Sequence, residues 1–298
     1  MDGFLTSRIL SDLLYGVTDG VTISLVALSL VLIWRSTNVL NFAQGAMAMF
    51  ATYVGMGLLS YNLAYWWCVL ISVVAGMALG GLVERTVVRR LYGKPELNPI
   101  VVMVGLLLVL ESTAAAIWGS TARSLPTPFS FEYWQIGGKP FGLSPFAVFE
   151  IIAAVLAAAA IGALFRFTKI GLQLRASALA PEVSRLLGVR VGRMLTLGWV
   201  LASGVGALAA VLVSSDISGL TPGVMDTIFV FGFVAAAIGG LESPVGALVV
   251  GIALGILDAF ITDFWNPNYV TIATLALLVV VLMIRPQGLF SKRIARRV

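Results

Sequence analysis

The sequence predicts an all-α integral membrane protein, a polytopic bundle of about eight or nine transmembrane helices in which some helices are short or broken. Of its 298 residues, 59% are hydrophobic and only 11% are charged, with a mean hydropathy of +1.01. An ordinary soluble domain has about a quarter of its residues charged. The apolar residues also gather in runs of about 20, the length a helix needs to cross a bilayer. These observations exclude a soluble globular enzyme and a disordered chain.

Seven long apolar segments and a broken pair supply the predicted spans. In chain order they are 12–34, 41–59, 64–88, 98–118, 144–165, 194–213, 227–241, 245–262 and 269–285. Lipid admits only helices or closed barrels, and the alternating pattern of barrel strands is absent. The seventh and eighth segments are short and flank a break at 239–244. We interpret this break either as a turn between two short spans or as the tip of a re-entrant hairpin.

The basic residues predict how the chain is oriented. Sixteen of the nineteen Lys and Arg residues are Arg35 or belong to clusters at 85–94, 166–193 and 285–297. The other three are Arg8, Arg123 and Lys139. Nine crossings bring these places to one side, which the positive-inside rule makes the cytoplasm. The N-terminus is then external and the C-terminus cytoplasmic. If 41–59 does not cross fully, eight crossings remain and the N-terminus moves inside.

The polar segments leave room for a single transmembrane domain, 1–298. They comprise an external loop at 119–143, one long cytoplasmic loop at 166–193 and a basic cytoplasmic tail at 286–298. The net charge of +5 fits cytoplasmic loops on anionic lipid rather than nucleic acid. There is no histidine, and the single Cys68 lies in an apolar run, so we expect no metal site. No GxxxxGK[ST] phosphate loop occurs, so we expect no ATP hydrolysis by that route and no enzyme activity in this chain.

The long basic loop predicts a short helix on the cytoplasmic surface. Pro181 suits a first helical turn, Glu182 favours the N-terminal dipole, and Gly188 can end the helix in a left-handed conformation. Such a helix can fit a groove on a partner. The alternative is a basic loop that lies on lipid headgroups. The residues singled out for docking are Arg175, Ala176, Ala178, Pro181, Glu182, Leu186, Leu187 and Gly188.

Two other stretches predict a pathway for a polar solute. Asn41 and Gln44 begin an otherwise apolar span, where polar side chains prefer the bundle interior or a water-filled cavity. The glycine-interrupted break near 239–244 is typical of broken-helix transport sites. Helix caps and helix–helix hydrogen bonds explain Asn41 and Gln44 equally well, and close packing explains most of the glycines better than a transport site does. The residues singled out for the pathway are Asn38, Asn41, Gln44, Gly45, Gly239 and Gly240.

Three acidic residues, Asp19, Glu111 and Asp258, fall within apolar runs, where a charge is costly. A proton-coupled secondary transporter of a small polar solute would use Glu111 and Asp258 as relays. The absence of histidine and of intramembrane lysine weakens that alternative, and we expect these acids to serve packing or to line a cavity. An intramembrane enzyme has even less support, because no metal ligands and no Ser-Lys pair lie at membrane depth.

Five motifs occur in order and together resemble one family. They are Asn41-Phe42-Ala43-Gln44-Gly45, Glu84-Arg85 with Arg89-Arg90, the segment Leu172 to Gly188, Gly239 to Ala247, and Arg285-Pro286-Gln287-Gly288-Leu289-Phe290. In this combination the chain resembles the permease subunits of ABC importers for branched-chain amino acids, over nearly its whole length.

This resemblance implies a function and a set of partners. It implies a translocation pathway for branched-chain or related amino acids, in the plasma (inner) membrane of a prokaryote. Residues 170–190 are similar to the cytoplasmic coupling loop that docks on the ATPase subunit. The implied partners are two ATP-binding subunits, which hold ATP and Mg, a second related permease, and an external solute-binding protein. Related permeases also serve urea and short amides, so these substrates stay open.

Overall fold

The computed structural model describes residues 2–57, 64–95, 97–125, 127–136, 139–140, 143–215 and 219–291. These residues are mostly helical, as the sequence predicts. The α-helices are α1 (Asp2–Thr37), α2 (Gln44–Gly57), α3 (Tyr65–Thr86), α4 (Leu97–Trp118), α5 (Pro145–Phe167), α6 (Lys169–Leu179), α7 (Pro181–Leu186), α8 (Val191–Ser215), α9 (Asp226–Gly239), α10 (Pro244–Phe264) and α11 (Val270–Ile284).

The other described elements are short. The 3-10 helices η2 (Val88–Arg90) and η3 (Pro267–Tyr269) precede α4 and α11. Within the predicted external loop, β1 (Gln135–Ile136) pairs in antiparallel fashion with β2 (Lys139–Pro140). A single bridge joins Arg123 to Leu220 and ties this loop to the chain between α8 and α9.

Seven of the described helices are long and apolar enough to cross a membrane. They are Arg8–Thr37, Tyr65–Arg90, Leu97–Trp118, Pro145–Phe167, Val191–Ser215, Pro244–Phe264 and Pro267–Ile284. The helices α2 and α9 have 14 residues each. That length spans about 21 Å of a hydrocarbon core about 30 Å thick. Helix α9 is therefore short, as the apolar run at 227–241 predicts, whereas α2 is shorter than the long span predicted at 41–59.

The prediction that 245–262 is a short span is wrong. Helix α10 runs for 21 residues, because the Ser243 hydroxyl caps its start and the buried Asp258 does not interrupt it. Asp258 is accommodated by a hydrogen bond of 2.9 Å from the Thr274 hydroxyl of α11. The break at 239–244 is a tight turn between α9 and α10, with Gly240 in the left-handed region at a φ of 95°.

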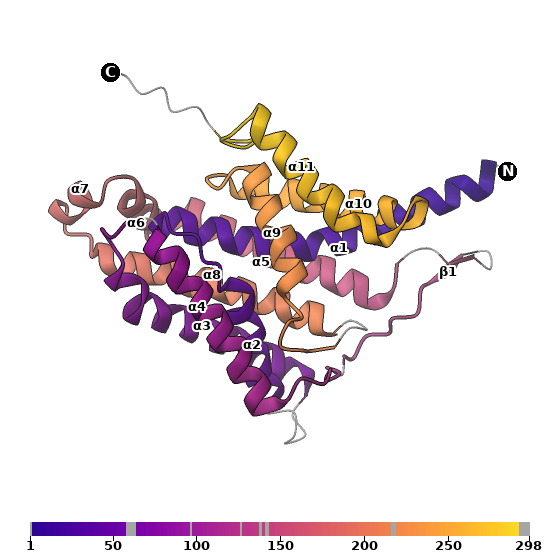
Figure 1. Ribbon diagram of the computed structural model, residues 1–298, viewed down its shortest axis with the longest axis horizontal. Helices are drawn as coiled ribbons and strands as arrows, with labels where there is room; N and C mark the ends of the chain where they lie inside the picture. Colours follow the sequence, from indigo (N-terminus) through magenta and orange to yellow (C-terminus); the bar gives the residue numbers. More distant parts are fainter. Residues whose placement is uncertain are drawn as a thin grey trace.

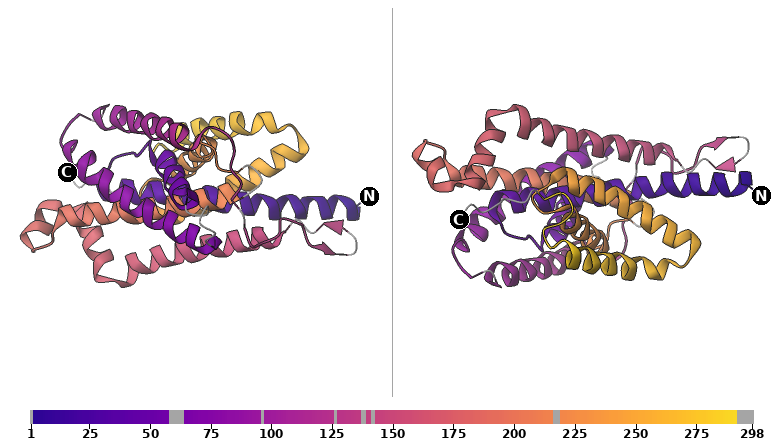
Figure 2. Two further views of the ribbon diagram at one scale, coloured as in Figure 1. Left: turned by 90° about the horizontal axis from the view of Figure 1, so that it is seen from below. Right: turned by 90° about the horizontal axis from the view of Figure 1, so that it is seen from above.

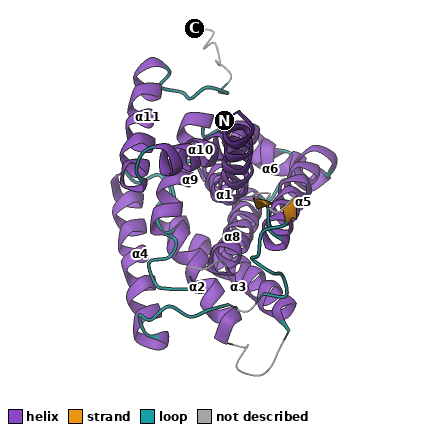
Figure 3. Cartoon of the chain, turned by 90° about the vertical axis from the view of Figure 1, so that its right-hand side faces the viewer, coloured by secondary structure: helices purple, strands orange, loops and turns teal. Residues whose placement is uncertain are grey.

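Glycines decide which helices form the interior. Helix α1 packs along α10, and its Gly20 lies against the backbone of Gly251 and Gly255. Small residues permit such close helix contacts in a membrane, where apolar burial alone does not drive association. In the apolar window of α1, 89% of residues are buried, against 17% in α4 and 6% in η3–α11. Seen end-on, α1 and α8 lie between α4 and α11 at one edge and α5 at the other (Figure 3).

Charged side chains identify one end of the bundle. The N-terminus and the α6–α7 segment lie at opposite ends of the long axis (Figures 1 and 2). Arg35, Arg175 and Glu242 line one cavity at the α6–α7 end. The Arg89 guanidinium reaches Gly192 at the start of α8 at the same end. We call this the basic end, and its identity as the cytoplasmic side stays a prediction.

Candidate functional site

The α6–α7 hairpin, residues 168–188, projects from the basic end of the bundle (Figure 1). Its first helix starts where the Thr168 hydroxyl accepts a hydrogen bond of 3.0 Å from the Gly171 amide. Gly171 lies so close to α5 that a Cβ there would be 2.6 Å from the Cα of Phe165. This glycine therefore lets the chain fold back on α5, and α6 leaves the bundle at a fixed place.

The second helix of the hairpin has the predicted ends. Pro181 begins α7, Glu182 lies in its first turn, and Gly188 follows it with a φ of 80°. Nothing lies within 4 Å of a Cβ at Gly188, so the backbone conformation alone favours glycine there. Glu182 accepts a hydrogen bond from Arg185 at 2.9 Å on the exposed face. Sequence reasoning found α7 but did not separate α6 from it.

Apolar side chains at the hairpin tip face solution. Leu186 is 88% exposed, Leu179 82% and Leu187 79%. Exposed leucines clustered at a helix end mark a surface that a partner or a lipid headgroup layer covers. Of the other predicted docking residues, Ala176 and Ala178 are half-buried, and the exposed Arg175 holds the Gly171 carbonyl at 3.4 Å.

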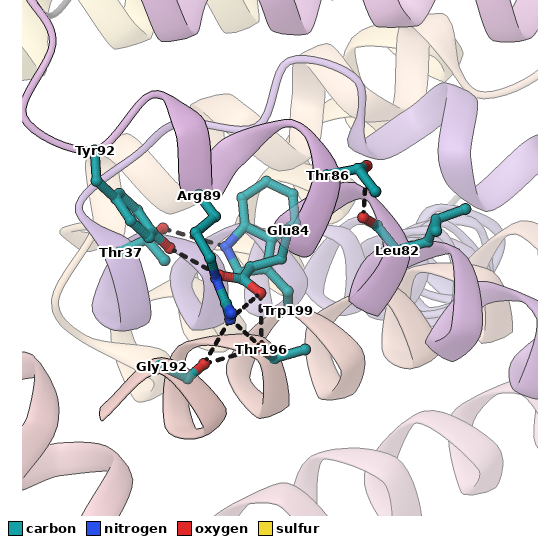
Figure 4. Close-up of polar contacts among 9 residues, drawn as sticks. All are labelled: Thr37, Leu82, Glu84, Thr86, Arg89, Tyr92, Gly192, Thr196 and Trp199. Carbon is teal, nitrogen blue, oxygen red and sulfur yellow. Dashed lines mark hydrogen bonds and ion pairs between the residues drawn. The ribbon is translucent and has the colours of Figure 1, made fainter. Parts of the chain in front are cut away.

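A buried carboxylate joins the start of α8, directly after the hairpin, to the end of α3 (Figure 4). The side chain of Glu84 has 0% exposure and accepts hydrogen bonds from Arg89 at 2.9 Å and from Thr196 at 2.6 Å. Arg89 also donates to the Gly192 carbonyl at 2.9 Å. A buried charge needs such a complete set of partners. Sequence reasoning quoted Glu84 and Arg89 only as motif residues, although a Glu five residues before an Arg at a span end was the available signal.

Tyr92 completes this set of contacts. We call it the Glu84 cluster; it consists of Glu84, Arg89, Tyr92, Gly192 and Thr196. The Tyr92 hydroxyl donates to Glu84 at 3.4 Å. Burial raises the pKa of the Tyr92 phenol far above its usual value, and the nearby Glu84 carboxylate raises it further. The phenol therefore stays protonated and remains a donor at every physiological pH. On the other side of the cluster, the Trp199 indole donates to the Thr37 hydroxyl at 3.3 Å and joins α8 to the end of α1.

The predicted pathway residues Asn41 and Gln44 lie buried at the start of α2, each 1% exposed. Asn41 accepts from the Ala43 amide at 3.0 Å and donates to Gln44 at 3.0 Å. Gln44 donates to the carbonyl of Ala202 in α8 at 3.3 Å. Their polar atoms are thus used to cap α2 and to join it to α8, and their part in a pathway stays a prediction.

The structure does not bring the other predicted pathway residues together at one place. Gly45 packs on Met225 and Phe229. A Cβ at Gly239 would be 2.5 Å from the backbone of Gly246, and one at Gly240 would be 2.5 Å from the Ser291 hydroxyl. Asn38, with a φ of 53°, lines the cavity at the basic end together with Arg175 and Ala178.

The acids within the spans take three different positions. Asp258 is 8% exposed and bonded to Thr274, while its second oxygen has no partner among the described residues. The Glu111 carboxyl lies beside that of Asp226 at the start of α9. Asp19 lies on the exposed side of α1. Over the described part of the chain, no three His, Cys, Asp or Glu side chains gather as a metal site.

Comparison of the sequence with known proteins identifies its family. Residues 13–282 match the family model described as the branched-chain amino acid transport system permease component. The match takes in α2, the Glu84 cluster, the hairpin and the turn between α9 and α10. The chain belongs to this family.

Several relatives in this comparison are full-length matches. BraD of Pseudomonas aeruginosa, a high-affinity branched-chain amino acid transport system permease protein, is 26% identical over 294 residues, which cover 95% of this chain and 96% of BraD. LivH of Escherichia coli K12, with the same description, is 26% identical over 295 residues, with the same coverage of 95% and 96%. The fructose import permease protein FruF of Bifidobacterium longum is 23% identical over 185 residues, or 61% of this chain and 49% of FruF.

Proposed function

We propose that this chain is the permease subunit of an ABC importer and forms the pathway for branched-chain amino acids. Separate ATPase subunits, which bind ATP and Mg, drive it. The observation that carries the proposal is the α6–α7 hairpin, whose tip leaves Leu186 and Leu187 uncovered beside the charged pair of Glu182 and Arg185. The permease names of relatives such as BraD and LivH support the substrate class.

The hairpin suits the transmission of motion from an ATPase subunit. Its tip is exposed, and its base is fixed to α5 at Gly171. The α8 helix that follows is held to α3 by the Glu84 cluster. A displacement of the tip would therefore move helices of the bundle, because within residues 143–215 no flexible loop lies between them to absorb it. Such a displacement shifts the permease between two states, which is how ATP binding can drive alternating access.

The proposal gives each end of the bundle a partner. The basic end is cytoplasmic and meets two ATP-binding subunits, in agreement with the positive-inside rule. The opposite end, with the N-terminus and the loop at 119–143, faces an external solute-binding protein. A second related permease covers part of the apolar outer surface, and lipid covers the rest.

The test is uptake by the complete importer in vesicles. The chain is assembled with its ATP-binding subunits, second permease and solute-binding protein, and ATP-dependent entry of tritiated leucine is measured. We expect Glu182→Lys to abolish coupled uptake while the protein still inserts, because it reverses a charge at the docking tip. Lys94→Glu also reverses the charge of an exposed side chain at the basic end but lies outside the hairpin, and it serves as the control.

Two results would contradict the proposal. One is unchanged ATP-driven uptake in the Glu182→Lys variant. The other is leucine uptake by the isolated chain under a proton gradient without any ATPase, which is the behaviour of a secondary transporter that uses Glu111 and Asp258.

A further inference from the structure

A cavity of about 300 Å³ opens at the basic end, between the end of α1, helix α6 and the turn that joins α9 to α10. Its volume is at the lower end of the range for small-molecule sites, which suits a ligand of amino-acid size. The Glu84 cluster lies outside its lining. The residues that the argument uses are Leu32, Arg35, Phe165, Leu174, Arg175 and Glu242.

The charged groups of this cavity come from three separate elements. Arg35 belongs to α1, Arg175 to α6, and Glu242 to the turn after α9. In the described ranges, no ion pair within 4 Å engages any of the three. Arg35 instead lies over the ring of Phe165, with its guanidinium carbon 5.7 Å from the ring centroid. Two guanidiniums and one carboxylate thus face a common space without neutralising one another directly.

The remaining wall is apolar. Leu32, Phe165 and Leu174 line the cavity beside the charged groups. Leu174 is only 6% exposed, so this wall is part of the packed base of the hairpin. The exposed side chains of Arg175 and Glu242 mark the side that is open to solution.

We propose that this cavity binds an α-amino acid with an apolar side chain, in a site open to solution at the basic end. The ligand carboxylate binds between Arg35 and Arg175, its ammonium group meets Glu242, and its side chain lies on Phe165 and Leu174. Guanidiniums recognise carboxylates in a bidentate manner. An anionic lipid headgroup suits the two arginines but not Glu242, whereas a zwitterion satisfies all three charges.

The site has a consequence for transport that rests on the proposed function. A bound zwitterion bridges α1, α6 and the turn after α9, and so restrains the hairpin through which the ATPase acts. It therefore stabilises one state of the permease over the other. Product that accumulates on this side slows further import.

Binding is tested on the permease assembled with the second permease and the ATP-binding subunits in phosphatidylcholine nanodiscs, without ATP and without solute-binding protein. Equilibrium binding of tritiated leucine is measured. We expect Arg35→Gln to weaken it at least tenfold. The competitors 4-methylpentanoate, which lacks the ammonium, and 3-methylbutylamine, which lacks the carboxylate, should each bind at least tenfold more weakly than leucine. Glu242→Gln should abolish the preference for leucine over 4-methylpentanoate.

Matched controls make the same changes outside the cavity. Arg90→Gln is an exposed change at the basic end, and Glu132→Gln an exposed change in the loop at 119–143. Both should bind leucine as the wild type does. Vesicles preloaded with leucine should take it up several-fold more slowly than empty ones, and Arg35→Gln should remove that difference.

The inference is overturned if the wild type does not bind leucine, or if Arg35→Gln and Glu242→Gln bind it as tightly as the wild type. It is also overturned if 4-methylpentanoate competes as well as leucine does, since the site then recognises only an anion. These failures are separable from failure of the proposed function. ATP-driven uptake with the solute-binding protein present can succeed while the nanodisc experiment shows no binding.

Discussion

The interior of the bundle and the α6–α7 hairpin use the same kinds of residue in opposite ways. In the interior, glycines such as Gly20 and Gly255 bring backbones together, and leucines such as Leu25 and Leu28 have at most 1% exposure. In the hairpin, a Cβ added at Gly188 would meet nothing within 4 Å, and Leu186 is 88% exposed. The difference teaches that hydrophobicity does not by itself assign a residue's role in this chain. Whether the residue contacts a neighbouring backbone assigns its role.

This comparison predicts two opposite gradients. Substitutions should cost less folding stability as they move from the interior, through the Glu84 cluster, to the hairpin. Their effect on coupling to ATP should grow in the same direction.

The largest effect on folding is expected for Gly255→Leu in α10. Its Cβ would overlap the backbone of Gly20 in α1, and backbone cannot move aside as a side chain can. Overpacking typically costs about 1–3 kcal/mol and occasionally more, and a clash with backbone places this variant at the upper end of that range. The expected result is loss of monodisperse protein on size-exclusion chromatography.

The control for this variant is Gly105→Leu, since Gly105 lies in α4 with nothing within 4 Å of a Cβ there. It should yield protein as the wild type does. Equal yields of the two variants would show that the glycine contacts between α1 and α10 do not hold the interior together.

At the boundary between the two regions, Arg89→Met should cost about 3 kcal/mol, because it leaves the buried Glu84 without its cation. The midpoint of thermal unfolding in detergent should fall markedly. Arg90→Met changes the exposed neighbour in the same way and should have little effect. Adding Glu84→Gln to Arg89→Met should recover part of the loss. No recovery in the double variant would mean that the unpaired charge is not the cause.

The sequence predicted much of the fold because hydropathy reports spans directly. The segments 64–88, 98–118 and 269–285 correspond to α3, α4 and α11 within a few residues. Hydropathy could not predict which helices are buried inside the bundle. Helices α1 and α11 have similar hydropathy, although α1 is buried and α11 is peripheral. The distinguishing signal was the small residues Gly16, Gly20 and Ser24 on one face of α1, which meet α10.

The site was predicted less evenly. Proline, acid and glycine at 181, 182 and 188 define α7, because capping is local and can be read from the sequence. Glu84 and Thr196 were not paired in advance, since their hydrogen bond joins residues 112 positions apart. The same limit hid the cavity formed by Arg35, Arg175 and Glu242, which only the packing of three elements brings together.

On the hairpin itself, Gly188→Val tests the backbone alone. A left-handed conformation costs an L-residue about 1–2 kcal/mol, and more for a β-branched one, while the open space adds no clash. We expect a small fall in the unfolding midpoint and a large loss of ATP-coupled uptake, because the direction of the α7 tip changes. Gly188→Asn tolerates the same φ and should retain most uptake. If valine and asparagine behave alike, the left-handed conformation does not set the tip.

The smallest effect on folding and the clearest effect on coupling are expected together for Leu186→Ser. The side chain is 88% exposed, so its loss should change stability by less than about 0.5 kcal/mol. If an ATPase subunit covers it, coupled leucine uptake should fall several-fold while the unfolding midpoint stays constant. Leu289→Ser alters another exposed leucine outside the spans, 43% exposed, and should spare uptake. If the Leu186 variant loses stability and uptake together, the tip stabilises the permease and does not transmit force from the ATPase. The contrast between the interior and the hairpin would then not hold.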